Sequence, residues 1–132
     1  MAGAIRPDNR PLSPHLSVWR WHVTMACSIL HRLTGMALYA AAFGLGLWLM
    51  AVARGPDAYA PIGALLAAPF GQLLLYGLTG VLAYHFANGV RHLVFDLGQG
   101  MKPADAEASA WAAILFAFAA PLGLWALVTF GS

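Results

Sequence analysis

The chain is short of charge. Only 9% of its 132 residues are Asp, Glu, Lys or Arg, against roughly 25% in an ordinary soluble domain. At the same time 61% of the residues are hydrophobic. A soluble globular domain of this composition would lack the polar residues that cover a core. The composition therefore excludes an ordinary soluble protein and indicates that the natural solvent of the chain is lipid.

Two further shortages exclude other classes of protein. Seven basic and five acidic residues leave a net charge of only +2, which does not form the basic patch of a nucleic-acid-binding module. The single cysteine, Cys27, cannot close a disulfide within the chain, so the sequence is not a disulfide scaffold. Cys27 lies in an apolar run, which predicts a small buried hydrophobic residue without a functional role.

Charged residues are absent from three long stretches, residues 33–53, 58–90 and 108–132. A helix needs about 20 apolar residues to cross a hydrocarbon core of about 30 Å. The first and third stretches each fit one crossing. The middle stretch has 33 residues, which is too long for one upright helix and too short for two helices and a turn.

Prolines divide the middle stretch. Pro61 and Pro69 are both tolerated in the first turn of a helix, so a short interfacial piece near 58–67 can precede a span. The predicted fold is therefore an all-α membrane protein with three transmembrane helices, at about 23–53, 69–93 and 106–130.

The distribution of basic residues predicts the orientation. Residues 1–22 contain no apolar signal-peptide core and are expected to form a cytoplasmic cap that precedes the three-helix anchor at 23–132. Trp19 and Trp21 are expected in the headgroup layer. Six basic residues fall on the side of the N-terminus and the second loop, against only Arg54 on the other side, so the N-terminus is predicted to be cytoplasmic or in the matrix. The six are Arg6, Arg10, Arg20, Arg32, Arg91 and Lys102.

The first span carries a polar stripe at its cytoplasmic end. At about 100° per residue its members fall within an arc of roughly 100°. They are Thr24, Ser28, His31, Arg32 and Gly35. Ionisable groups at this depth are costly and usually face a bundle interior, where they serve a ligand or a relay. For Arg32 alone, the alternative is a long side chain that reaches lipid phosphates.

A second stripe lies on the second span and consists of His85, Gly89, His92 and Asp96. His92 and Asp96 lie near the cytoplasmic end and could serve as interfacial anchors, as could Arg91, which points away from the stripe. His85 differs because it lies about two turns inside the uncharged stretch, where solvation is difficult.

Three interpretations of His85 stay open on these residues alone. The imidazole could form a hydrogen bond between helices, bind haem iron as an axial ligand, or relay protons. Gly89, one turn along, would leave space for a flat macrocycle. A six-coordinate haem needs a second ligand on its opposite face. His92 projects from the same helix face as His85, so that ligand would come from His31 or from another chain.

The motifs resemble one known family. RPLSPH at 10–15, SILHRLTG at 28–35 and GVRHL at 89–93, together with His85 and Asp96, resemble the cytochrome b556 membrane anchor subunit of succinate dehydrogenase. The resemblance implies a heteromeric helix bundle in the bacterial inner membrane, in which a second small membrane subunit shares one haem b. It also implies that an iron–sulfur subunit and a flavoprotein subunit dock on the cytoplasmic side. Electrons from succinate would then reach ubiquinone.

The resemblance also implies residue roles. His85 would be the axial ligand of the haem iron, with the opposite ligand supplied by the partner subunit. His31 and Arg32 would approach the haem propionates, and Ser28 and Arg32 would line the quinone site. Asp96 would either pair with Arg32 or carry protons to the reduced quinone.

Two other functions are compatible with the sequence. A fumarate reductase anchor would run the reaction in the opposite direction with menaquinone, and no residue in the chain decides the direction. A non-redox protein with three spans, such as a transporter component, would use its histidines only to pack helices. In the favoured interpretation the chain is one subunit of an enzyme and is not catalytic alone.

Overall fold

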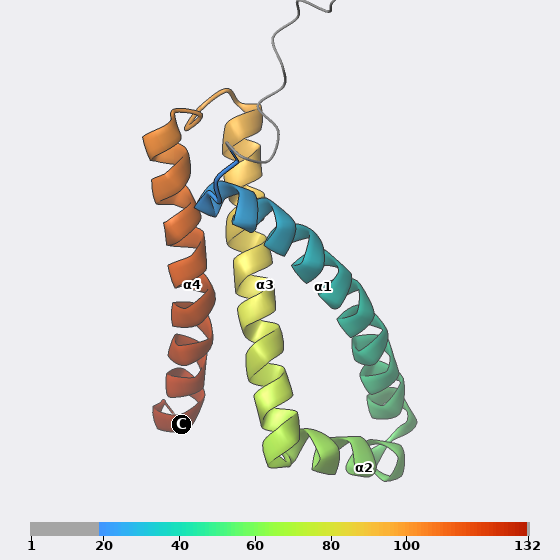
Figure 1. The fold of residues 1–132 in the computed structure, drawn as a ribbon. Coiled ribbons are helices and arrows are strands. Elements are labelled where there is room, and N and C mark those ends of the chain that lie inside the picture. The colour runs from blue at the N-terminus through green and yellow to red at the C-terminus, as the bar shows by residue number, and fades with distance from the viewer. Residues whose placement is uncertain (1–18, 132) are drawn as a thin grey trace, which may run out of the picture.

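The computed structural model describes residues 19–131, in which all regular secondary structure is α-helical (Figure 1). Its helices are α1 (Val23–Arg54), α2 (Pro56–Ala67), α3 (Pro69–Asp96) and α4 (Pro103–Phe130). By length and composition α1, α3 and α4 could each cross a membrane, which confirms the three candidate spans predicted from the sequence. The motif at 10–15 and most of the predicted cap lie outside the described residues.

Proline and glycine set the helix boundaries. Pro56, Pro69 and Pro103 each occupy the first turn of a helix. Backbone N–H groups in the first turn form no hydrogen bond within the helix, so proline, which lacks an N–H, is tolerated there. Gly55 follows α1 with a φ of 102°, a conformation that residues with a Cβ rarely adopt. The middle uncharged stretch is consequently divided into α2 and α3.

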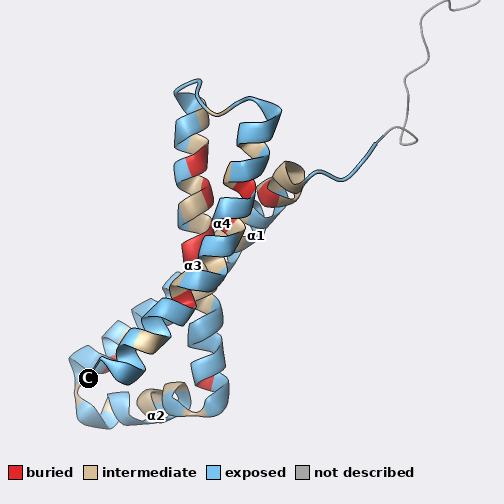
Figure 2. Cartoon of the chain, turned by 90° about the vertical axis from the view of Figure 1, so that its left-hand side faces the viewer, coloured by how far each residue is buried: buried red, intermediate tan, exposed pale blue. Residues whose placement is uncertain are grey.

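The three long helices meet at one end of the molecule. Helices α3 and α4 run antiparallel and share the most extensive contact, while α1 crosses α3 near its own N-terminus and then diverges (Figure 1). Helix α2 connects the far end of α1 to the start of α3. Figure 2 shows that most of the buried residues gather where α1, α3 and α4 meet.

The core at this meeting point takes one side chain from each long helix. Cys27, Tyr84 and Ala110 form the buried cluster, and the Tyr84 hydroxyl donates a hydrogen bond of 2.9 Å to the Cys27 carbonyl. Cys27 is fully buried and unbridged, as expected of a small hydrophobic residue. The cluster holds the N-terminal part of α1 against the α3–α4 pair.

Arg91 is buried and joins the end of α3 to the start of α4. Its guanidinium donates to the Ser109 hydroxyl at 2.9 Å, to the Ala106 carbonyl at 3.0 Å and to Asn88 Oδ1 at 3.4 Å. It also lies 4.5 Å from the centre of the Phe95 ring, in a cation–π contact. The interfacial-anchor interpretation of Arg91 is therefore wrong, because these partners on α3 and α4 hold the side chain inside the helix pair.

Candidate functional site

The face of α1 that packs against α3 is rotated relative to the predicted polar stripe, away from Arg32. Cys27 is buried, His31 and Thr34 are half-buried against α3, Ser28 is half-buried, and Arg32 is exposed. At about 100° per residue, Cys27 and Thr34 lie roughly 40–60° from His31, on the side away from Arg32. His31 is thus in the helix interface, with Ser28 and Arg32 at its open edge.

Three histidines form one stacked cluster, which we call the histidine stack: His85, His31 and His92. The ring centres of His31 and His85 are 4.0 Å apart with an interplanar angle of 12°, and those of His31 and His92 are 5.0 Å apart with an angle of 18°. Seven residues of helix separate His85 from His92, a rise of about 10.5 Å. The His31 ring of α1 therefore fits between the two α3 rings.

Of the two glycines beside the histidine stack, Gly35 permits this close approach. A Cβ on Gly35 would lie 3.1 Å from Cε1 of His85, closer than ordinary packing allows. A Cβ on Gly89 would lie 3.9 Å from Cε1 of His31, an ordinary contact distance. The space beside Gly89, which the sequence suggested for a macrocycle, is faced by the His31 ring.

Replacing Gly35 with valine should force α1 and α3 apart at His85. Overpacking of this kind costs about 1–3 kcal/mol, so the thermal midpoint of the detergent-purified protein should fall by several degrees. Gly44→Val is the matched control, because Gly44 is in the same helix and nothing lies within 4 Å of its Cβ position. Equal midpoints for the two variants would contradict a tight contact at Gly35.

The two nitrogens of His85 have different surroundings. Nδ1 lies 3.1 Å from Oγ1 of Thr34 on α1, so a hydrogen bond does link the two helices. Nε2 has no hydrogen-bond partner among residues 19–131. It is also not one of the buried side-chain atoms of these residues that lack a partner. The packing and ligand interpretations are therefore compatible, because each uses a different nitrogen. Thr34 was missed as a site residue, although its hydroxyl lies within the motif at 28–35.

The free Nε2 fits the requirement for a haem ligand, since an unprotonated imidazole nitrogen is a strong axial donor to iron. His31 stacks on the face of the His85 ring, and the lone pair of each imidazole lies in the plane of its own ring. The two histidines are therefore not arranged to hold one metal ion from opposite sides. No group of three or more His, Cys, Asp or Glu in the described part of the chain is arranged to hold a metal ion by itself.

Two buried polar atoms of the described residues lack a hydrogen-bond partner, namely His31 Nδ1 and Asn88 Nδ2. Asn88 is fully buried, and sequence reasoning missed it because an isolated asparagine gives no periodic signal. A buried N–H without an acceptor is costly. A neutral His31 ring is therefore favoured with its proton on Nε2, where it can serve a group outside the helix pair.

The remaining predicted site residues lie at the same end of the molecule. Arg32 and Asp96 are both exposed, and no ion pair joins them in the described structure. The Arg32 guanidinium is consequently available to an anionic or carbonyl group from outside the chain. Ser28 lies one helical turn before Arg32, so its hydroxyl and the Arg32 guanidinium can contact the same ligand.

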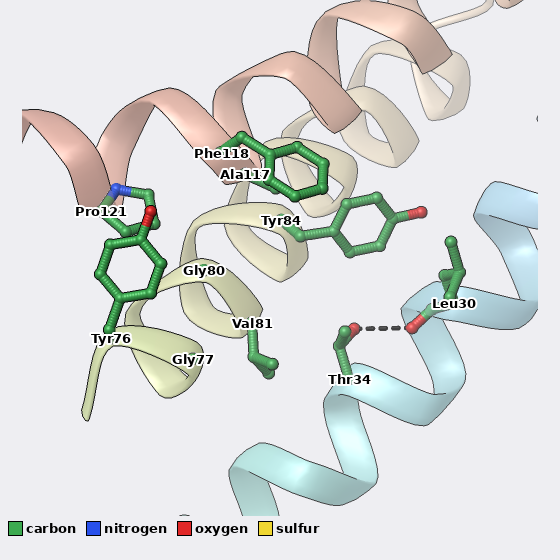
Figure 3. A pocket seen from close by; sticks show the side chains of 10 residues that line it. All are labelled: Leu30, Thr34, Tyr76, Gly77, Gly80, Val81, Tyr84, Ala117, Phe118 and Pro121. Carbon is green, nitrogen blue, oxygen red and sulfur yellow. Dashed lines mark hydrogen bonds between the residues drawn. The ribbon is translucent and has the colours of Figure 1, made fainter. Parts of the chain in front are cut away.

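An apolar pocket of about 270 Å³ lies between α1, α3 and α4, next to the histidine stack (Figure 3). Thr34 lines this pocket and also contacts His85. The hydroxyl groups of the lining come from Thr34, Tyr76 and Tyr84. The pocket does not include Ser28 or Arg32, so it is separate from the polar edge of the site.

The chain is similar to known membrane subunits. The model of the succinate dehydrogenase/fumarate reductase transmembrane subunit family matches residues 6–124. The chain is 37% identical over 110 residues to the succinate dehydrogenase cytochrome b556 subunit of Paracoccus denitrificans, covering 83% of this chain and 85% of that protein.

Mitochondrial and further bacterial relatives align as well. The mitochondrial succinate dehydrogenase cytochrome b560 subunit of Sus scrofa is 35% identical over 124 residues, which covers 91% of this chain and 72% of the relative. The cytochrome b556 subunit of Rickettsia felis is 30% identical over 118 residues, which covers 89% and 92%. The family match spans the histidine stack, α1, α3 and most of α4, and the chain is a multi-pass membrane protein. The chain therefore belongs to the family of succinate dehydrogenase/fumarate reductase transmembrane subunits, as its motifs predicted.

Proposed function

We propose that this chain anchors a succinate dehydrogenase in the membrane, supplies one axial ligand of a haem b, and forms part of the site where ubiquinone is reduced. The observation that carries the proposal is the state of His85. This histidine lies inside a membrane-spanning helix, with Nδ1 held by Thr34 and Nε2 free. The relatives named as cytochrome b subunits support a haem as the group that Nε2 would bind.

His85, His31 and Arg32 have distinct roles toward the haem, which supplies one-electron transfer when bound. His85 would hold the iron through Nε2, and the opposite ligand would come from the partner subunit. His31 stands beside His85 with its second nitrogen available as a donor, and the exposed Arg32 adds a positive charge. His31 would donate a hydrogen bond to a propionate group, and Arg32 would offset its negative charge, which is costly in a low-dielectric environment.

Ser28 and Arg32 are assigned to the quinone. A quinone carbonyl oxygen gains negative charge as it is reduced, so a hydroxyl and a guanidinium at this oxygen stabilise the product more than the substrate. Both side chains lie at the open edge of the α1–α3 interface rather than inside it. Asp96 is exposed at the same end and would carry protons to the reduced quinone.

The chain would work within a larger complex. A second small membrane anchor would complete the helix bundle, and an iron–sulfur subunit and a flavoprotein subunit would dock on the cytoplasmic face. The large apolar side chains exposed on the helices, such as Leu73, Phe118 and Phe130, suit contact with lipid and with this second anchor. Arg20, Arg32, Arg91 and Lys102 lie toward one end and Arg54 at the other, which supports an N-terminus in the cytoplasm or the matrix. We assign the complex to a bacterial inner membrane.

Deletion of the gene tests the proposal. Membranes from the deletion strain should lose succinate-dependent ubiquinone reduction together with a b-type haem signal in the reduced-minus-oxidised spectrum. Expression of this chain should restore both. Restoration of only fumarate reduction with menaquinol would favour the fumarate reductase alternative. A purified complex that contained the chain but no haem would favour a non-redox protein instead.

A further inference from the structure

The Thr34 hydroxyl occupies a defined position between α1 and α3. It donates to the Leu30 carbonyl at 2.8 Å, with the His31 carbonyl at 3.0 Å as a second acceptor (Figure 3 shows the Leu30 bond). Both of these atoms can only accept a hydrogen bond. The single hydroxyl hydrogen is therefore directed at the α1 backbone, and the Thr34 oxygen keeps its lone pairs for a donor on another helix.

The atom of the other helix at this oxygen is His85 Nδ1, at 3.1 Å. With the hydroxyl hydrogen directed at the Leu30 carbonyl, the arrangement assigns the proton of this contact to Nδ1, which then donates to Thr34 Oγ1. A neutral imidazole has only one N–H, so Nε2 of His85 is left with its lone pair. The hydroxyl of Thr34 thus selects the tautomer that can bind a metal through Nε2.

His92 provides an internal comparison. Its Nδ1 lies 2.7 Å from the Asn88 carbonyl of its own helix, and a carbonyl can only accept, so His92 has the same tautomer. The orientation of His92 is therefore set within α3, whereas that of His85 depends on a side chain of α1. The position of the His85 ring consequently depends on how α1 packs against α3.

Gly35 leaves space for the His85 ring. It directly follows Thr34, and a Cβ there would lie 3.1 Å from His85 Cε1. One residue of α1 thus holds the ring by a hydrogen bond while the next leaves the space that the ring occupies. The ring is half-buried, and these two contacts orient it together with its stacking on His31.

We infer that Thr34 is a positioning residue for the haem ligand, an inference that rests on the function proposed for His85. By accepting the hydrogen bond from Nδ1–H, Thr34 would orient the ring and raise the electron density at Nε2. Such outer hydrogen bonds increase the basicity of a metal-bound histidine, and their loss typically weakens metal binding about 10–100-fold. A more basic ligand favours the oxidised metal, so this bond lowers the midpoint potential of the haem.

The test uses the whole complex with Thr34→Val, which keeps the shape of the side chain and removes the hydroxyl, and with Thr34→Ser, which keeps the hydroxyl. Redox titration of T34V should give a more positive midpoint potential than wild type, and T34S a potential close to wild type. Transfer of haem to excess apomyoglobin should be about tenfold faster for T34V than for wild type. A purely structural role for the threonine side chain would not produce the recovery in T34S.

A wild-type potential and wild-type haem retention in T34V would overturn the inference. Should T34V fail to assemble, Thr34→Cys takes its place, because a thiol is a weak acceptor of similar size and predicts a smaller positive shift. An unchanged potential in T34C would then overturn it. The proposed function fails separately, and this inference with it, if the wild-type complex contains no haem or if His85→Ala retains the wild-type haem.

Discussion

Replacing His85 with alanine should abolish the wild-type b-type haem signal of the complex. The variant removes the nitrogen that we assign to the iron, and the partner's ligand alone would leave one axial position empty. The reduced-minus-oxidised spectrum of the purified complex measures the outcome. Bound low-spin haem should fall at least tenfold, since loss of a ligand exceeds the 10–100-fold effect of losing its hydrogen-bond partner.

His92→Ala is the matched control for this experiment. His92 belongs to the same helix and the same histidine stack, and it has the same tautomer as His85. Its loss should leave the low-spin spectrum in place. His31→Ala should likewise retain an iron with two axial ligands, because His31 stacks beside His85 rather than opposite it. An unchanged spectrum in His85→Ala would contradict the assignment of His85 as the haem ligand. Loss of an axial ligand in His31→Ala would instead identify His31 as the ligand.

Replacing Arg32 with leucine should reduce the rate of quinone reduction about 10- to 100-fold, while succinate oxidation by a soluble artificial acceptor stays within twofold of wild type. Removing one donor from a site where negative charge develops costs about 10²–10³ in rate in enclosed enzyme sites, and Arg32 is exposed, so a smaller factor applies. Ser28→Ala should lower the same rate by a smaller factor, because a neutral hydroxyl forms weaker hydrogen bonds than a guanidinium.

Arg54→Leu controls for the loss of a positive charge from α1. Arg54 is an exposed arginine in the last turn of the same helix, at the end opposite to Arg32. Both activities of this variant should match wild type. An equal loss of quinone reduction and of succinate oxidation in Arg32→Leu would mean that Arg32 supports assembly of the complex rather than the quinone.

Much of the fold followed from local features of the sequence. The uncharged stretches predicted three long apolar helices, and these are present as α1, α3 and α4. Pro69 lies in the first turn of α3, as predicted, because a first-turn N–H has no partner within the helix. Pro61 was predicted for the first turn of the short helix but lies inside α2, which begins at Pro56. Cys27 was expected among apolar neighbours, and it is fully buried.

Less of the site could be read in this way. Arg91 looked like an interfacial anchor because it lies near the end of a charge-free stretch, yet Ser109 and Ala106 of α4 hold it inside the helix pair. Thr34 lay just outside the predicted stripe, although its hydroxyl contacts His85. Periodicity gives the angles between residues of one helix, but it does not say which of those angles faces a neighbour.

The sequence by itself therefore determined that the chain belongs in lipid, that it forms three long apolar helices at nearly their observed positions, and that His31 and His85 are unusual in an apolar segment. Only the tertiary structure decided that His31 lies between His85 and His92, that Thr34 leaves Nε2 of His85 free, and that Arg32 faces outward. The physical reason is that composition and backbone chemistry act along one helix. The rotation of each helix and its register against the next depend on side chains from both, such as Gly35 against the His85 ring.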